Sequence, residues 1–219
     1  MAPISTTPEL SRGELGLALR NPGMQLEGLR YPITPIGMHY LLIHFDIPQV
    51  DPATYELGVT GHVRNLLKLS LEEIKARPKV TMPVMMECGG NGQAHLSPHP
   101  VSAPWHDEAV GCAEWTGTSL HPILEEAGLM DDAVEIRFYG YDRGIDQGVE
   151  HDYERSLRVE DALREEVFLA YEMNGMPLSP QQGSPLRLIV PNWYGMASVK
   201  WLKEIRAIEE PFYSGDQNV

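Results

Sequence analysis

The residue best suited to chemistry in this sequence is Cys88, at the start of a glycine-rich loop. It follows an apolar stretch and precedes Gly89, Gly90, Asn91 and Gly92. Glycine lacks a Cβ, so such a loop lets the backbone approach a bulky ligand closely. A thiolate is a soft ligand that suits soft metals, which makes Cys88 a candidate metal ligand. A buried, unreactive cysteine beside a glycine turn fits the same pattern.

Two cations lie in unusually apolar surroundings. Arg187 stands between Leu186 and Leu188, and Lys200 directly precedes Trp201, in a chain with only 17 lysines and arginines. A guanidinium within an apolar strand needs an anionic partner, either a bound ligand or a nearby carboxylate. Lys200 could instead lay its apolar stem along a core aromatic. The two residues therefore predict an anion site, with internal ion pairing and packing as the alternatives.

A proline-rich stretch after the cysteine loop carries His95, His99 and His106, with Trp105 among them. Imidazole titrates near neutral pH, so these histidines could transfer protons at the entrance of a site, or they could simply be exposed. Cys88, His95 and His99 also form a Cys-x6-His-x3-His pattern, which would suit a zinc-dependent hydrolase or a structural zinc site. That spacing matches no standard zinc motif.

The overall composition is that of a folded globular protein with a strongly acidic surface. Of the 219 residues 42% are hydrophobic, and 31 acidic against 17 basic side chains give a formal net charge of −14. This charge repels nucleic acid and anionic lipid, so neither is expected as a partner, although it would attract a basic electron carrier. The N-terminus shows no export signal, which predicts a cytoplasmic location. Two cysteines are too few for a disulfide framework.

Short strands should outnumber helices in this chain. Helices are expected where Ser70 and Glu73 can form a capping box, from Thr118 through residues 122–127 to Gly128, and over residues 159–164. Asn174 and Gly175 predict a turn. The fold class expected is α+β, with mixed β-sheets and short helices. Windows rich in β-branched and aromatic residues predict strands at residues 38–45, 55–60, 80–86, 133–139, 167–173, 186–190 and 201–208.

Several motifs resemble those of one known family in both order and spacing. Residues 87–91 read Glu-Cys-Gly-Gly-Asn, residues 113–117 read Ala-Glu-Trp-Thr-Gly, and residues 120–128 end in Leu-Glu-Glu-Ala-Gly. Residues 169–175 read Leu-Ala-Tyr-Glu-Met-Asn-Gly, and residues 198–202 read Ser-Val-Lys-Trp-Leu. Together they resemble the sulfite oxidase family of molybdenum-cofactor oxidoreductases.

The resemblance covers about residues 31–212 and implies a molybdopterin-binding fold with Cys88 as the metal ligand. It implies an N-terminal extension over residues 1–30 and a cofactor domain over residues 31–219, without the dimerisation domain common in the family. By position, it implies catalytic roles for Cys88, Gln93, His99 and Tyr213. Cofactor contacts are implied for Tyr40, His44, Cys88, Asp142, Gln182, Arg187, Ser198, Val199 and Lys200.

The sequence departs from sulfite oxidases at three positions. Leu42 and Gln93 stand where the family has arginines, and Gln182 stands at a family histidine. A dianion such as sulfite needs cationic, bidentate donors, which leucine and glutamine do not supply. We therefore expect a less charged substrate and inefficient sulfite oxidation.

The function expected is transfer of an oxygen atom to or from a small substrate at the molybdenum cofactor. Because the chain has no Cys-x-x-Cys-His haem motif, electrons should pass through a separate partner such as a cytochrome. A relative that binds the cofactor without catalysis is one alternative. The zinc-dependent hydrolase using Cys88, His95 and His99 is another.

Overall fold

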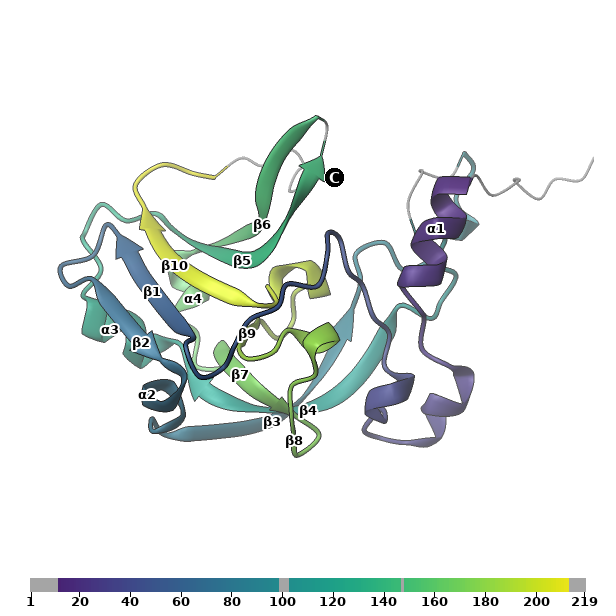
Figure 1. Ribbon diagram of the computed structural model, residues 1–219, viewed down its shortest axis with the longest axis horizontal. Helices are drawn as coiled ribbons and strands as arrows, with labels where there is room; N and C mark the ends of the chain where they lie inside the picture. Colours follow the sequence, from purple (N-terminus) through teal and green to yellow (C-terminus); the bar gives the residue numbers. More distant parts are fainter. Residues whose placement is uncertain (1–11, 99–102, 147, 213–219) are drawn as a thin grey trace, which may run out of the picture.

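Two sheets form the body of the protein in the computed structural model, which describes residues 12–98, 103–146 and 148–212 (Figure 1). The first sheet has the strand order β2-β1-β10-β5-β6. In it β1 and β10 are parallel, and the other neighbouring strands are antiparallel. Its strands are β1 (Glu56–Gly61), β2 (Leu67–Ser70), β5 (Glu135–Asp146), β6 (Val149–Arg158) and β10 (Leu202–Ile208).

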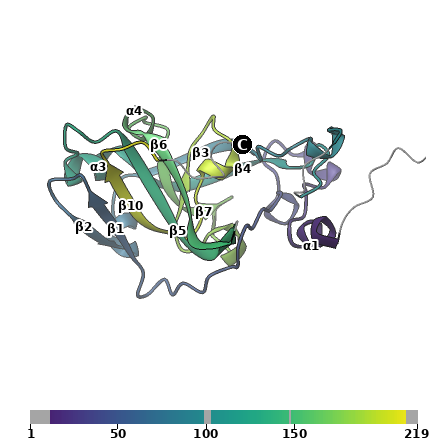
Figure 2. The ribbon, with the colours of Figure 1, turned by 90° about the horizontal axis from the view of Figure 1, so that it is seen from above.

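The second sheet is antiparallel and has the order β3-β4-β7-β8, with β9 also paired to β7. The helices are short and lie at the ends and edges of the sheets, as Figures 1 and 2 show. This arrangement confirms the expected α+β class. The strands are β3 (Lys79–Glu87), β4 (Val110–Ser119), β7 (Phe168–Met173), β8 (Met176–Pro177) and β9 (Arg187–Ile189). The helices are α1 (Arg12–Arg20), α2 (Leu71–Lys75), α3 (His121–Ala127) and α4 (Val159–Ala162).

Strand β7 separates two apolar cores. Successive side chains of a strand point to opposite faces, so Leu169 and Tyr171 enter one core while Phe168 and Ala170 enter the other. The larger core lies between the sheets and includes residues of β1, β5, β10 and α3. The smaller core gathers Tyr40, Trp105, Trp115 and the apolar side chains of β3 and β4 around the cysteine loop. The cysteine loop is therefore supported by a core of its own.

The predicted helix starts are confirmed in part. Ser70 accepts a hydrogen bond from the backbone N–H of Glu73, whose carboxylate in turn accepts from the Ser70 N–H, which completes the capping box of α2. Helix α3 begins at His121 and not at Thr118, which lies in β4, and it ends at Ala127, before Gly128 with φ of 69°. The third helix is shorter than predicted: α4 ends at Ala162 and not at residue 164.

The strand predicted over residues 38–45 is wrong. This segment begins in a 3-10 turn, η2 (Ile36–Met38), and continues as an irregular chain. Its backbone bonds to loops instead of a strand: the Leu41 N–H donates to the Pro22 carbonyl, and the Ile43 N–H donates to Asn21 Oδ1. An apolar, β-branched composition here reflects burial beside the cavity described below rather than sheet pairing.

The prediction also missed four strands, β2, β4, β6 and β8, and the helix α1. Strand β4 carries Gly111, Gly117 and Glu114, residues that are uncommon in strands. Strand β6 is rich in charged side chains, such as Glu154, which pairs with Arg137 of β5. Cross-strand ion pairs stabilise a solvated strand face that hydrophobic patterning alone does not reveal.

The N-terminal segment packs against the region after the cysteine loop. The Met24 N–H donates to the Glu108 carbonyl at 2.8 Å, and the Thr34 N–H donates to the Cys112 carbonyl at 2.6 Å. In Figure 2 this segment lies at one end of the molecule, with α1 at its edge. The described part of the expected extension, residues 12–30, is thus joined to the rest of the fold by backbone hydrogen bonds.

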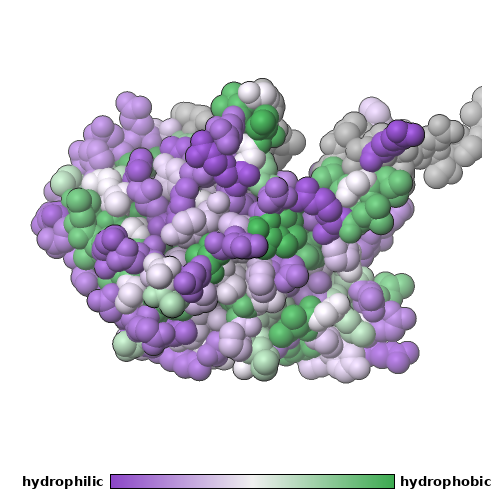
Figure 3. Space-filling view, viewed as in Figure 1, coloured by the Kyte–Doolittle hydropathy of each residue, from purple (hydrophilic) through white to green (hydrophobic). Residues whose placement is uncertain are grey.

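The face of the molecule seen in Figure 3 is mostly hydrophilic, as expected for an acidic protein. Apolar atoms gather at the tip of the β5–β6 hairpin and on α1, where Ile145, Val149 and Leu19 are exposed. Within the described ranges, no helix combines the length and apolar character needed to cross a membrane.

Gly117 lies where β4 and β7 approach each other at an irregularity in the ladder. A Cβ on Gly117 would lie 1.9 Å from the Leu169 carbonyl oxygen. We expect Gly117→Ala to lower the free energy of unfolding by about 3 kcal/mol or more, because the two backbones must separate. Urea unfolding followed by circular dichroism measures this.

Gly58 of β1 provides the control, since a Cβ there would meet its nearest atoms at 3.8 Å, which is ordinary contact. Gly58→Ala should change stability by less than about 1 kcal/mol. Equal losses in the two variants would show that the close approach at Gly117 is not what limits substitution.

Candidate functional site

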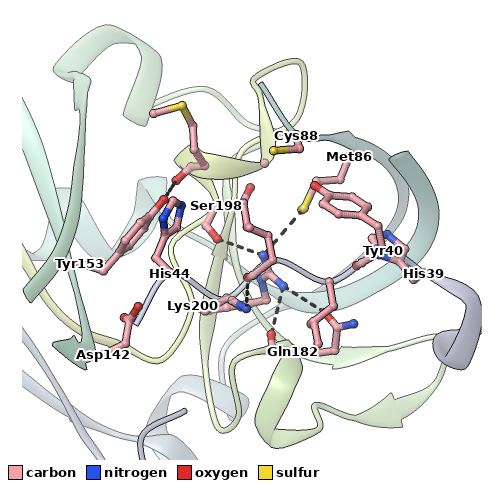
Figure 4. Close-up of a pocket in the computed structure, with 15 residues that line it drawn as sticks. His39, Tyr40, His44, Met86, Cys88, Asp142, Tyr153, Gln182, Ser198 and Lys200 are labelled. Atoms are coloured by element: carbon pink, nitrogen blue, oxygen red, sulfur yellow. Dashed lines mark hydrogen bonds between the residues drawn. The ribbon is translucent and has the colours of Figure 1, made fainter. Parts of the chain in front are cut away.

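A cavity lies beside the cysteine loop (Figure 4). In Figure 4, Cys88 and Met86 lie near each other on one side, while Asp142 and Tyr153 lie on the other. The lining comes from segments that are far apart in sequence, so only the complete fold forms it. The residues are His39, Tyr40, Leu41, Leu42, His44, Met86, Cys88, Asp142, Tyr153, Gln182, Arg187, Gly195, Met196, Ser198 and Lys200.

Cys88 follows the last residue of β3, and hydrogen bonds hold its loop. The Cys88 N–H donates to the Ala109 carbonyl at 2.9 Å, and the Gly90 N–H donates to the Cys88 sulfur at 3.4 Å. The Asn91 side chain donates to Glu87 Oε1 and accepts from the Ala109 N–H, both at 3.0 Å. Burial raises the pKa of the Cys88 thiol, and the Glu87 carboxylate acts in the same sense. The sulfur thus stands on a fixed loop at the cavity surface.

Arg187, on β9, is buried without a carboxylate partner. Its guanidinium donates to the Gln182 and Ser198 carbonyls at 3.0 Å each and lies over the Trp115 ring at 4.7 Å. Among the described residues no ion pair involves it, and its Nε lacks a hydrogen-bond partner. Burial lowers its pKa to about 10, so it stays charged at neutral pH. The ion pairing considered from sequence is absent here, and the cation remains available to an anion.

Lys200 and Asp142 bring two further ionisable groups to the cavity. Lys200 Nζ donates to the Leu42 carbonyl at 2.7 Å and to the Gln181 carbonyl at 3.1 Å. Burial and, after it, the charge of Arg187 lower the pKa of Lys200 to about 7. Burial also raises the pKa of Asp142 to about 7, and its Oδ1 has no hydrogen-bond partner. Both groups therefore respond to the charge of whatever fills the cavity.

Aromatic side chains line the remaining sides of the cavity. His44 stacks on Tyr153 with ring centroids 5.1 Å apart, and the Tyr153 hydroxyl donates to the Met196 carbonyl at 2.9 Å. His39 stacks on Tyr40, also at 5.1 Å. Burial raises the pKa of the Tyr40 hydroxyl well above its usual value, which keeps it neutral. These rings suit a flat ring system more than a small inorganic ion.

Most of the residues proposed from sequence for cofactor contacts come together here. Tyr40, His44, Cys88, Asp142, Gln182, Arg187, Ser198 and Lys200 all line the cavity.

Val199 does not line the cavity. Its side chain is fully buried in the larger core, and its carbonyl accepts the Leu188 N–H at 2.8 Å. Gln93 packs against Gly90 and does not line the cavity either. His99 and Tyr213 lie outside the described residues.

Sequence reasoning missed five lining residues, namely His39, Met86, Tyr153, Gly195 and Met196. Met86 could have been found, since it lies on β3 two positions before the cysteine. Tyr153 could not, because its strand β6 was not recognised. Gly195 fits closely beside Tyr40: a Cβ there would lie 2.4 Å from the Tyr40 hydroxyl oxygen.

The zinc alternative remains untested, because His99 lies outside the described residues. His95 pairs with Asp107 at 3.4 Å. Within the described ranges, one group of potential metal ligands is close enough to share an ion: His62, Asp132 and Glu209. His62 lies 3.4 Å from each carboxylate, through different ring nitrogens, which is the arrangement of an ion-paired imidazole.

Comparison with known proteins identifies the family. Residues 44–215 match the family described as the oxidoreductase molybdopterin binding domain. This chain belongs to that family. The mitochondrial sulfite oxidase of Drosophila melanogaster is 37% identical over 177 residues, which cover 78% of this chain and 30% of the relative. An NADH nitrate reductase of Ulva prolifera is 29% identical, with 81% of this chain and 21% of the relative covered.

Among solved structures, the sulfane dehydrogenase SoxCD of Paracoccus pantotrophus resembles this molybdopterin-binding domain with a TM-score of 0.70. The sequence identity is 26%, and the match covers 81% of this chain and 44% of that one. This domain spans less than half the length of the relatives named here. The family, its sulfite-oxidase type and its molybdenum cofactor follow from these matches.

The residues of the cavity fit this cofactor. Its phosphate and dithiolene are anionic, and Arg187 and Lys200 present cations that have no carboxylate in contact among the described residues. The unpartnered Asp142 Oδ1 offers an acceptor to ring N–H groups. Cys88 offers a soft sulfur ligand at the same surface. Each feature that is costly in the protein alone becomes favourable with the cofactor bound.

The Asp142 carboxyl should make the stability of the cofactor-free protein depend on pH. Its pKa is about 7 in the folded state against 3.8 for an ordinary carboxyl, so the folded state keeps a proton that the unfolded chain releases. Stability therefore falls as pH rises from about 4 to about 7. Asp142→Asn removes this cost and should stabilise by about 2 kcal/mol more at pH 8 than at pH 5, measured by urea unfolding.

Asp131 serves as the control, because its side chain is fully exposed and, within the described part of the chain, pairs only with Arg64, at 3.8 Å. Asp131→Asn should show no such gain at pH 8. A stability change in Asp142→Asn that is the same at both pH values would contradict the expected protonation of Asp142.

Proposed function

We propose that this domain catalyses oxygen-atom transfer to or from a small substrate at its molybdenum cofactor, with Cys88 as the protein ligand of the metal. The observation that carries the proposal is the cavity in which the Cys88 sulfur, the unpaired Arg187 and Lys200 line one space. Relatives named sulfite oxidase and nitrate reductase support an oxidoreductase. When bound, the cofactor supplies a metal that exchanges two electrons together with an oxygen atom.

The residues of the cavity divide into charged residues that would bind the cofactor and aromatic residues that form its walls. Arg187 is held by two backbone carbonyls at 3.0 Å, so its charge is fixed in place before an anion arrives. Lys200 has its pKa near 7 and takes up a proton when an anion binds, because the negative charge favours the ammonium form. The stacked His44 and Tyr153 form one wall of the cavity. These roles concern binding and orientation, which is the part of such chemistry that a protein supplies.

The substrate proposed is less charged than sulfite. Leu42 lines the cavity at the position where the family has an arginine, and Leu41, Met86 and Met196 add further apolar surface. Gln93, at the second arginine position, packs against Gly90 and offers no charge. Without guanidinium groups at these places, a dianion would lose its water without gaining charged hydrogen bonds. A neutral or singly charged molecule that donates or accepts an oxygen atom suits this surface better.

Electrons are proposed to pass between the metal and a separate redox protein such as a cytochrome. The net charge of −14 favours a partner with a basic surface. Artificial redox dyes should then exchange electrons with the bound metal without the partner protein being present.

Replacing the metal ligand tests the proposal directly. Cys88→Ser should lower turnover by about 100-fold or more while much of the pterin stays bound, because Arg187 and Lys200 bind the cofactor separately from the metal. Pterin is measured by fluorescence after release, molybdenum by elemental analysis, and turnover with artificial electron carriers. Cys112→Ser, which alters a cysteine away from the cavity lining, is the control. Undiminished turnover in Cys88→Ser would disprove ligation by this sulfur.

Restoring positive charge tests the proposed substrate class. Leu42→Arg should lower the KM for sulfite by about 10-fold, since a bidentate guanidinium strengthens binding of a dianion. Adding Gln93→Arg should have a smaller effect, because Gln93 packs against Gly90 and does not line the cavity. Steady-state assays with sulfite and with a neutral sulfoxide compare the two substrates. Efficient sulfite turnover by the unmodified protein would contradict the proposal.

A further inference from the structure

A strap of irregular backbone, residues 40–45, forms part of the cavity wall. Its residues Tyr40, Leu41, Leu42 and His44 line the cavity, and in Figure 4 Tyr40 and His44 lie at different sides of it. The strap belongs to none of the strands of either sheet. Because no ladder of hydrogen bonds fixes it, its position depends on individual contacts with other segments.

Residues 20–22, where helix α1 ends, form a clasp on this strap. Every second residue of the strap, from 41 to 45, is hydrogen-bonded to the clasp through its backbone. The Leu41 N–H donates to the Pro22 carbonyl at 3.0 Å, the Ile43 N–H donates to Asn21 Oδ1 at 2.7 Å, and the Arg20 guanidinium donates to the Phe45 carbonyl. The clasp thus supplies the pairing that a neighbouring strand would otherwise provide.

Asn21 contributes the buried bond of the clasp that depends on a side chain. Asn21 is 2% exposed and Ile43 is 5% exposed, so both groups of this bond are removed from water. The Nδ2 of Asn21 has no hydrogen-bond partner among the described residues. The cost of burying the side-chain amide is therefore offset through its oxygen, by the bond from the strap.

The clasp is itself anchored beside the cysteine loop. The Met24 N–H donates to the Glu108 carbonyl at 2.8 Å, and a Cβ on Gly23 would lie 1.9 Å from Glu108 Cγ, so the two segments are in close contact. The next residue, Ala109, accepts the Cys88 N–H at 2.9 Å. The clasp therefore connects the strap on one side of the cavity with the segment that holds the cysteine loop.

We propose that the clasp of residues 20–22 holds the strap closed over the bound molybdenum cofactor and slows its release, with Asn21 as the main positioning residue. Asn21 is not among the residues that line the cavity, and it acts through the backbone of Ile43. The matched family region begins at residue 44, so the clasp lies outside it. The inference requires that the cofactor occupies the cavity, and it is independent of the substrate and of metal ligation by Cys88.

Asn21→Leu tests the inference, because leucine has a similar size and offers no hydrogen-bond acceptor. Hydrogen exchange of the Ile43 amide is measured in the cofactor-free and the cofactor-loaded protein. Release of the cofactor from the loaded protein is followed by pterin fluorescence after dilution. We expect both rates to rise by about 10-fold, since a buried N–H loses its partner.

Asn21→Asp is the conservative variant. It keeps the Oδ1 acceptor and lacks the Nδ2 group, which has no partner among the described residues. It should retain most of the protection of Ile43 and release the cofactor at close to the original rate. A defect as large as that of Asn21→Leu would contradict the role of this acceptor.

Asn65→Leu is the matched control, because the Asn65 side chain donates to the Glu126 carbonyl at 3.1 Å and does not line the cavity. It should change neither rate. Unchanged Ile43 exchange in Asn21→Leu would overturn the inference, as would faster exchange with unchanged cofactor release. The exchange of the cofactor-free protein needs no turnover, so these outcomes are distinct from a failure of the proposed catalysis.

Arg20→Ala decides the matter if Asn21→Leu fails to fold. The Arg20 side chain is 48% exposed, so its removal should leave the fold intact. We expect strap exchange and cofactor release to rise by about 3-fold, a smaller effect because the lost bond is exposed. Rates equal to those of the unmodified protein would then overturn the inference.

Discussion

The placement of two cations in the interior of an acidic protein is the constraint on which the site depends. Arg187 and Lys200 are held by backbone carbonyls, and neither forms an ion pair among the described residues. Removing such charges from water is costly unless an opposite charge joins them. Hydrogen bonds from the backbone carbonyls offset part of this desolvation cost, and an anionic ligand would offset the remainder. The affinity of the molybdopterin-binding domain for an anionic ligand and the energetic cost of these buried charges are thus two aspects of the same arrangement.

The surrounding fold is arranged so that these charges cannot escape to solvent. Strand β9 carries Arg187 between two cores, and the Trp115 ring lies beneath its guanidinium. The irregular segment of residues 39–44 covers the cavity from another direction and supplies the Leu42 carbonyl that binds Lys200. A chain with regular pairing here would have bonded its carbonyls to a neighbouring strand. Irregular backbone leaves carbonyl groups free for a side-chain cation.

Sequence reasoning predicted the fold class, the cysteine loop and most of the cavity lining, because these depend on local signals or on family motifs. The Ser70–Glu73 capping box and the helix end at Gly128 can be predicted from the sequence, because their conformations depend on residues close by in the chain. The error at residues 38–45 arose because apolar composition reports burial and not hydrogen-bond pairing. Strand β6 was missed for the opposite reason, since its charged side chains are stabilised by partners on β5 that are distant in sequence.

The sharing of β7 by both cores has a consequence for motion. Leu169 and Tyr171 face one core while Phe168 and Ala170 face the other, so neither core can loosen without exposing a side of the same strand. Amide hydrogens of β7 and of its neighbours β4 and β9 should then exchange only through a common opening event that involves most of the domain. The cysteine loop, which follows β3 beside β4, and the strand β9 that carries Arg187 consequently keep a fixed separation until that opening event.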